Sequence, residues 1–159
     1  MISNHLPDTS RVWIYPCDRF FNEEESKIVK EDLNNFLSSW EAHGKKLAAD
    51  GELVDNKFLI LMADENAAHV TGCSIDSSVA FVKSLEQKFG VNFFDRTQVN
   101  YLENGEIAQC HLNDFWARRK ALVVTEDTIV FDNLVKNKGQ FNSSWKVPFK
   151  DSWHQEMWR

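Results

Sequence analysis

The residues of this chain whose types and spacing could do chemistry lie between positions 69 and 76. The segment reads His69-Val70-Thr71-Gly72-Cys73-Ser74-Ile75-Asp76 and leads into a predicted helix. A helix N-terminus offers free backbone N–H groups and the positive end of the helix dipole, which favour a bound anion. The same field favours a thiolate, so Cys73 is the candidate nucleophile and His69 its candidate base.

A purely structural role would account for the same residues. Thr71 or Ser74 would cap the helix, and Asp76 would complement its dipole. Cys73 would then be a small buried apolar group. The segment therefore predicts a ligand site, a catalytic thiol or only a well-capped helix.

Arg96 would extend the site toward an acidic ligand. It follows Asp95, and an arginine next to a carboxylate beyond a helix most often forms a local bidentate bridge. If the segment binds a small anion, the predicted ligand-binding residues are Gly72, Cys73, Ser74, Asp76 and Arg96.

No pattern in the sequence indicates a metal or another cofactor. The histidines and cysteines lack the paired spacing of metal ligands, and Cys110 and His111 would point to opposite faces of a strand. Neither G-x-x-x-x-G-K-[ST] nor G-x-G-x-x-G occurs, and there is no G-x-S-x-G elbow. We expect no cofactor and no metal, and these absences favour a binding protein over an enzyme.

Composition excludes several classes of protein. The chain has 159 residues, with 24 acidic and 18 basic, and a net charge of −6. Nucleic acids and anionic membranes both need a basic footprint, so we expect neither as a partner. The longest apolar run, 58–63, is far shorter than the ~20 residues that span a membrane. Three cysteines without paired spacing and an N-terminus without signal-peptide features predict the cytoplasm.

Hydrophobic periodicity predicts the elements that position these residues. Residues 11–15 form a first strand, and a helix over 23–41 begins at the N-cap Asn22 and stops at Gly44. Residues 45–54 are extended, with a turn signal at Asp50-Gly51. The later predicted elements are a strand at 57–63, a helix at 75–89 ended by Gly90, a hairpin of 97–102 and 106–110 turning at Asn104-Gly105, a helix at 113–119, and a hairpin of 122–124 and 128–131.

This order predicts the fold class. Strand, helix, two strands, helix, strand is the order of a ferredoxin-like sandwich. We therefore predict a single α+β domain over residues 1–159, with helices on one face of a mainly antiparallel sheet and additional hairpin and helix elements toward the C-terminus. A three-layer α/β arrangement is the alternative.

The C-terminal segment, about residues 136–159, is rich in aromatic side chains. Four of the six tryptophans lie from Trp116 onward. Because such a segment is costly to leave in water, we expect it to dock either on its own domain or on a second subunit in a homodimer.

Several motifs resemble a known family. From about residue 10 to residue 158 the chain is similar to a family of short, uncharacterised bacterial proteins. The motifs that carry this resemblance are 40–44 (WEAHG), 56–61 (NKFLIL), 72–79 (GCSIDSSV), 94–96 (FDR), 131–135 (FDNLV) and 152–154 (SWH). Its members often carry the label "ABC transporter ATPase", yet this sequence has no Walker A or signature motif. The resemblance implies a bacterial source and brings no catalytic residues.

The sequence thus favours a cytoplasmic, non-catalytic domain that binds a ligand or a partner and self-associates. A thiol-dependent enzyme that uses Cys73 is the alternative hypothesis. ATP hydrolysis is supported by the family label alone.

Overall fold

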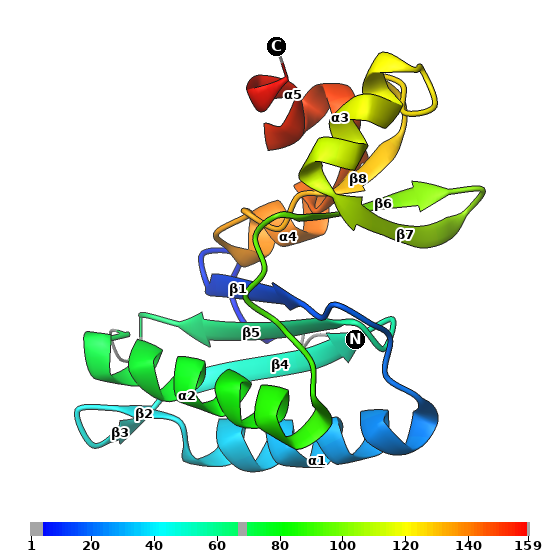
Figure 1. Ribbon diagram of the computed structural model, residues 1–159. Coiled ribbons are helices and arrows are strands. Elements are labelled where there is room, and N and C mark those ends of the chain that lie inside the picture. The colour runs from blue at the N-terminus through cyan, green and yellow to red at the C-terminus, as the bar shows by residue number, and fades with distance from the viewer. Residues whose placement is uncertain (1–4, 67–69, 159) are drawn as a thin grey trace. The chain divides into compact units, whose positions relative to one another are not determined.

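The computed structural model describes residues 5–66 and 70–158 and is of the α+β class, as predicted (Figure 1). The chain divides into two compact units. Unit 1 comprises Met1–Phe94 with Lys136–Gly139, and unit 2 comprises Asp95–Val135 with Gln140–Arg159. The expectation of a single domain stays a prediction.

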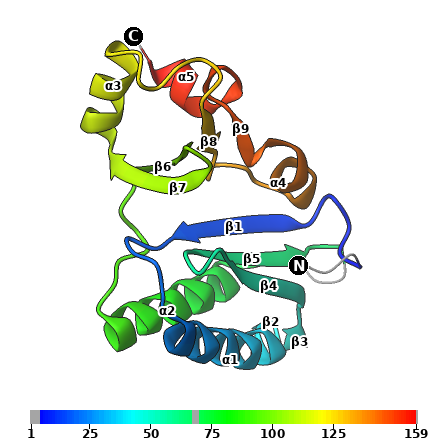
Figure 2. The same ribbon diagram turned by 90° about the vertical axis from the view of Figure 1, so that its right-hand side faces the viewer.

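Unit 1 is built on a three-stranded antiparallel sheet in the order β1-β5-β4. Two long helices lie side by side along one face of this sheet (Figure 2). The elements of unit 1 are β1 (Arg11–Pro16), α1 (Glu23–Ser39), β2 (Glu41–Ala42), β3 (Lys45–Lys46), β4 (Ala48–Val54), β5 (Phe58–Asp64) and α2 (Gly72–Phe89).

Local sequence signals set the ends of both helices. The Asn22 side chain accepts the Glu25 N–H, and the Glu25 side chain accepts the Asn22 N–H, which completes a capping box. α2 ends at Gly90, whose φ of 62° is the left-handed conformation typical of a C-cap. The predicted stop of α1 at Gly44 was wrong. α1 ends at Ser39, and Gly44 (φ 76°) turns the chain between β2 and β3, where a left-handed residue is needed.

β5 is the central strand, as its continuous apolar run predicted. Its alternate residues Leu59, Leu61 and Ala63 belong to the core beneath the helices, together with Val29 and Leu33 of α1. The intervening residues of β5 are also completely buried. A strand that is buried on both faces cannot show the polar alternation of a surface strand.

The predicted turn at Asp50-Gly51 was wrong, because both residues lie within β4. The turn between β4 and β5 uses Asp55 and Asn56, which both have a φ of 54°. Gly51 is required for packing. A Cβ placed there would lie 2.9 Å from the carbonyl oxygen of Ile60 and 3.2 Å from Cδ1 of Leu33 on α1.

Unit 2 contains a four-stranded antiparallel sheet in the order β7-β6-β8-β9. Asn104 and Gly105, both with positive φ, form the predicted turn between β6 and β7. The elements that make up or enter unit 2 are β6 (Gln98–Glu103), β7 (Glu106–His111), α3 (Leu112–Lys120), β8 (Ile129–Phe131), α4 (Lys138–Ser144), β9 (Lys146–Pro148), the 3₁₀ helix η1 (Phe149–Asp151) and α5 (Trp153–Met157).

Two predictions about strand pairing fail in unit 2. β6 does not complete the first sheet but pairs with β7 and β8, so the ferredoxin-like arrangement is not confirmed. Residues 122–124 are not a strand. The N–H groups of Val123 and Val124 donate to the Arg118 carbonyl at the end of α3, and β8 pairs with β9 instead.

From residue 140 onward, the aromatic C-terminal segment belongs to unit 2. Val147 and Phe149 join a core with Val99, Tyr101 and Phe115, and Phe149 is completely buried. Among the described residues, no helix is long and apolar enough to cross a membrane.

Candidate functional site

The start of α2 is a capped helix end. Thr71 is the N-cap: its Oγ1 accepts the Ser74 N–H at 3.2 Å, and the Ser74 Oγ accepts the Thr71 N–H at 2.7 Å. The Ser74 hydroxyl also donates to the Thr71 carbonyl at 2.9 Å, and Ser74 is buried. The two hydroxyls that could have met an anion are therefore engaged in the capping box.

The remaining candidates at this helix end are exposed to solvent. Gly72, Cys73 and Asp76 all lie on the open side of the first turn. The Cys73 carbonyl accepts the Ser77 hydroxyl at 3.0 Å, and no described side chain bonds the Cys73 thiol. His69, the candidate base, lies outside the described residues.

Arg96 is exposed and belongs to unit 2, whereas the other four predicted ligand-binding residues belong to unit 1. The neighbouring Asp95 carboxylate accepts the Thr97 hydroxyl at 2.6 Å and the Thr97 N–H at 2.9 Å, which holds its pKa below the usual value. An Asp95–Arg96 bridge is not among the ion pairs of the described residues. The five-residue ligand site stays a prediction.

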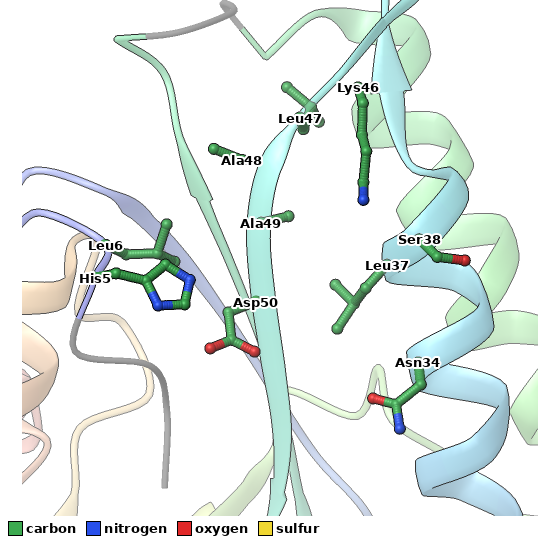
Figure 3. A pocket seen from close by; sticks show the side chains of 10 residues that line it. All are labelled: His5, Leu6, Asn34, Leu37, Ser38, Lys46, Leu47, Ala48, Ala49 and Asp50. Atoms are coloured by element: carbon green, nitrogen blue, oxygen red, sulfur yellow. The ribbon is translucent and has the colours of Figure 1, made fainter.

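A cavity that the sequence did not indicate lies in unit 1, beside β4 (Figure 3). Its volume is about 510 Å³. It is lined by His5, Leu6, Asn34, Leu37, Ser38, Lys46, Leu47, Ala48, Ala49 and Asp50. Three segments thus share it: the N-terminal segment, α1 and the chain from β3 into β4.

The cavity follows the free edge of the sheet. β4 is an edge strand, and no other described strand pairs with its outer side. In an antiparallel ladder the backbone groups of alternate residues point toward the paired strand, and those of the others point away. Gly51 donates its N–H to the Asp50 Oδ1 at 2.8 Å, which places Gly51, Ala49 and Leu53 in the outward-pointing set.

Small side chains keep the backbone of β4 accessible within the cavity. Figure 3 shows Ala49 directed toward α1 and Ala48 directed to the opposite side of the strand. His5 and Asp50 lie on the side away from α1, and Lys46 lies on the α1 side. The cavity therefore borders the start of an edge strand, with Asp50 and His5 on one side and Lys46 on the other.

Sequence reasoning missed this cavity for an identifiable reason. The Asp50-Gly51 pair in the extended stretch 45–54 is a turn signal. The small residues of the same stretch are what leave an edge strand uncovered. The signal was present in the sequence, but the partner strand that makes β4 an edge is set only by the sheet.

The most deeply buried titratable groups elsewhere have structural roles. The Lys57 ammonium group donates to the Cys17 carbonyl, and burial lowers the Lys57 pKa. His154 is 2% exposed and stacks on Trp153, and burial lowers its pKa to about 4. Within the described ranges, no group of three or more His, Cys, Asp or Glu residues could hold a metal ion.

Comparisons of the chain with protein-family models, with curated proteins and with solved structures found no match. The family resemblance of the sequence stays an expectation. The function is therefore argued from the geometry of the described residues alone.

Proposed function

We propose that the protein is a non-catalytic binding domain that takes an extended segment of a partner protein onto the free edge of β4. One observation carries this proposal: a cavity of about 510 Å³ borders Ala48, Ala49 and Asp50 at the start of β4, which is an edge strand.

The physical basis is strand addition. An extended peptide can pair with an exposed sheet edge through main-chain hydrogen bonds, while flanking pockets select its side chains. Here the outward backbone groups are those of Ala49 within the cavity and of Gly51 and Leu53 farther along β4, and a bound segment would replace the Asp50 Oδ1 as the partner of the Gly51 N–H. Leu37 and Asn34 of α1 form the wall on one side, and Leu6 and His5 form the other.

The lining favours binding over catalysis. Ser38 carries the one hydroxyl among the described lining residues, and it donates to the Asn35 carbonyl within α1 at 2.8 Å. That hydroxyl is engaged in its own helix, so it is poorly placed as a nucleophile.

Backbone amide exchange on the full chain tests the proposal. The probes are synthetic peptides of seven residues, the length of β4, that alternate valine with lysine, with glutamate or with serine. At least one peptide should slow the exchange of the Ala49 and Leu53 amides. The Ala49→Pro variant should abolish that binding, since it removes an outward N–H and leaves the pairing with β5 intact.

Ile107→Pro is the matched control, because it places the same change on the edge strand β7 of unit 2 and should leave peptide binding unchanged. If none of the three peptides alters the exchange of Ala49 and Leu53, the proposed function is wrong. If protection of these amides instead grows with protein concentration alone, the occupant of the edge is a second copy of the chain.

A thiol-dependent enzyme is the second candidate function. The observation that favours it is the exposure of Cys73 in the first turn of α2, whereas Cys17 is completely buried. Fast alkylation of Cys73 relative to a free thiol would support this candidate, and the measurement is described below.

The proposal also includes what the sequence predicts about location, ligand, assembly, source and fold relationship. The free state of all three cysteines supports a reducing, cytoplasmic location. On the sequence arguments given above, we also propose a small anionic ligand at the start of α2 and a homodimer. The same arguments support a bacterial source and a ferredoxin-like relationship of unit 1. Phe149 and Val147 of the aromatic segment are buried within unit 2, so these two residues do not support that segment as the homodimer interface.

A further inference from the structure

We infer that a second cavity, in unit 2, binds an organic ammonium ion, with the charge beside Asp132 and an alkyl chain against Leu134 and Trp153. The residues that line this cavity all belong to unit 2, whereas those of the β4 cavity belong to unit 1. The inference therefore goes beyond the proposed function and does not depend on it.

The second cavity has a volume of about 260 Å³. It lies among the turn that follows β8, the helix α4 and the first residue of α5. The lining residues are Asp132, Leu134, Val135, Gln140, Ser144 and Trp153. Pockets for drug-sized ligands typically measure ~300–1,000 Å³, so this cavity suits a single small group.

Asp132 carries the one formal charge among the described lining residues. Its Oδ1 accepts the Leu134 N–H at 3.2 Å, and its Oδ2 accepts the Trp153 N–H at 3.2 Å. A carboxylate oxygen has two acceptor sites, so each oxygen keeps room for a further donor. No ion pair of the described residues includes Asp132. The carboxylate is thus held in place by neutral donors, and its charge is not compensated by a described cation.

Leu134 and Trp153 give the cavity an apolar wall. The Leu134 side chain is 60% exposed, and an alkyl chain packed on it would remove part of that surface from water. His154 stacks on Trp153 at 4.1 Å and covers one face of the indole, which leaves the other face and the ring edge for the cavity. The face of an indole attracts a cation.

His154 does not oppose a cation at neutral pH. Burial lowers its pKa to about 4, so the ring that stacks on Trp153 is uncharged at pH 7.

This lining favours an organic ammonium ion over other small ligands. Asp132 would repel an anion and would give a neutral molecule a weaker hydrogen bond than a charged one. Among the described residues, no group of three or more His, Cys, Asp or Glu residues could hold a metal ion, and an apolar wall offers nothing to a hydrated metal. The net charge of −6 attracts cations at long range.

Titration of the full chain with butylammonium, butanol and butyrate tests this inference. The readout is the NMR amide signals of Leu134 and Trp153, because both N–H groups donate to the Asp132 carboxylate. Butylammonium should shift both signals saturably and bind roughly tenfold tighter than butanol, since hydrogen bonds between charged groups are stronger than those of neutral ones. Butyrate should bind most weakly.

Asp132→Asn should bring the affinities of butylammonium and butanol close together. The introduced asparagine would keep one side-chain oxygen for a backbone N–H. Asp151→Asn is the matched control, because it removes an exposed carboxylate of unit 2 that does not line the cavity, and it should leave the ratio unchanged.

Leu134→Ala tests the apolar wall separately, at an exposed side chain whose removal should leave the fold intact. The affinity for butylammonium should fall a few-fold. The affinity for methylammonium, which lacks the chain, should stay the same.

The ammonium group can belong to a free amine or to a lysine of a protein segment. The peptide acetyl-Gly-Lys-Gly-amide distinguishes the two sources. Tighter binding of the peptide than of butylammonium would indicate a protein segment, and equal or weaker binding would indicate a free amine.

The inference is wrong if butylammonium shifts neither amide signal or binds no tighter than butanol. A preference for butylammonium that survives Asp132→Asn would contradict the role of Asp132, and an unchanged affinity in Leu134→Ala would contradict the alkyl contact. None of these results bears on strand addition, whose readouts are the Ala49 and Leu53 amides of unit 1.

Discussion

At the scale of single residues, burial separates the three cysteines. Cys17 is completely buried and Cys110 is half-buried, and burial is the main cause that raises the pKa of each thiol. Cys73 is exposed. Exposure and thiolate content both govern the alkylation rate, so Cys73 should react first even without any catalytic role.

We expect iodoacetamide at pH 7 to modify Cys73 before Cys17 and Cys110, as followed by peptide mass spectrometry. Exposure alone already explains that order of modification. To distinguish a catalytic thiol from a structural one, the alkylation rate of Cys73 is therefore compared with that of glutathione, a free thiol. A Cys73 rate within about threefold of glutathione fits a structural residue, whereas a rate more than about tenfold higher would support the thiol enzyme. Cys73→Ser is the control that identifies the modified site.

His154 makes the stability of unit 2 depend on pH. Its ring stacks on Trp153 at 4.1 Å and lies 5.6 Å from the Phe115 ring, and burial lowers its pKa from 6.5 to about 4. Between these two values the unfolded chain binds more protons than the folded one. The free energy of unfolding therefore falls as the pH drops from about 6.5 to about 4, and below that this contribution is constant.

The loss should reach about 3.5 kcal/mol at most, since the pKa falls from 6.5 to about 4 and each pKa unit corresponds to about 1.4 kcal/mol. Urea unfolding followed by tryptophan fluorescence at pH 7, 5 and 4 measures it. His154→Gln removes this titration and leaves that of the carboxylates, so the difference between the two proteins isolates the histidine. Parallel pH profiles for both proteins would contradict the burial argument.

At the scale of elements, the contact between α1 and β4 depends on a residue without a side chain. A Cβ at Gly51 would lie 2.9 Å from the Ile60 carbonyl oxygen and within 3.3 Å of Cδ1 atoms of Leu33 and Leu37. Because one of these atoms belongs to the backbone of β5, rotation of a side chain cannot relieve the clash.

Gly51→Ala should lower the free energy of unfolding by about 1–3 kcal/mol in urea denaturation. Gly72→Ala is the matched control, because a Cβ there meets no atom within 4 Å and the residue lies in the first turn of α2. That change should be neutral or stabilise the protein by up to about 1 kcal/mol. Equal effects of the two substitutions would show that α1 and β4 can separate without cost.

At the scale of the whole molecule, the C-terminal segment contributes residues to both units. Residues Lys136–Gly139 belong to unit 1, where the Lys138 ammonium group donates to the Leu6 carbonyl at 2.7 Å. Residues 140–159 belong to unit 2, where β9 pairs with β8 and Phe149 is completely buried. Removal of this segment therefore affects the fold before it affects any assembly.

A chain truncated after Val135 should lose the cooperative unfolding of unit 2, because β8 would lose a strand partner and Phe115 would lose its contact with Phe149. Urea unfolding and amide exchange of β6 measure this loss. Met157→Ser, at a residue that is 61% exposed, should change stability by less than about 0.5 kcal/mol. Retained protection of β6 in the truncated chain would contradict the assignment of β9 to this core.

The sequence by itself determined most of the local elements. Asn22 with Glu25, Gly90, and Asn104 with Gly105 set helix ends and a turn, because their conformational preferences act within a few residues. It also located the start of α2, although the hydroxyls there serve the capping box. For the candidate site, it did not indicate which segments share a cavity, and its own site residues at the start of α2 stay a prediction.

Only the tertiary structure decided strand pairing and the edge of each sheet. The sequence does not reveal that β6 joins a second sheet, or that β4 keeps a free side next to α1 and His5. Pairing depends on contacts between residues far apart in the chain, and in β4 these contacts override the local preference of Asp50-Gly51 for a turn. Position 51 of this strand needs a glycine because the Ile60 carbonyl, Leu33 and Leu37 leave no space for a Cβ, which is a property of packing and not of the local sequence.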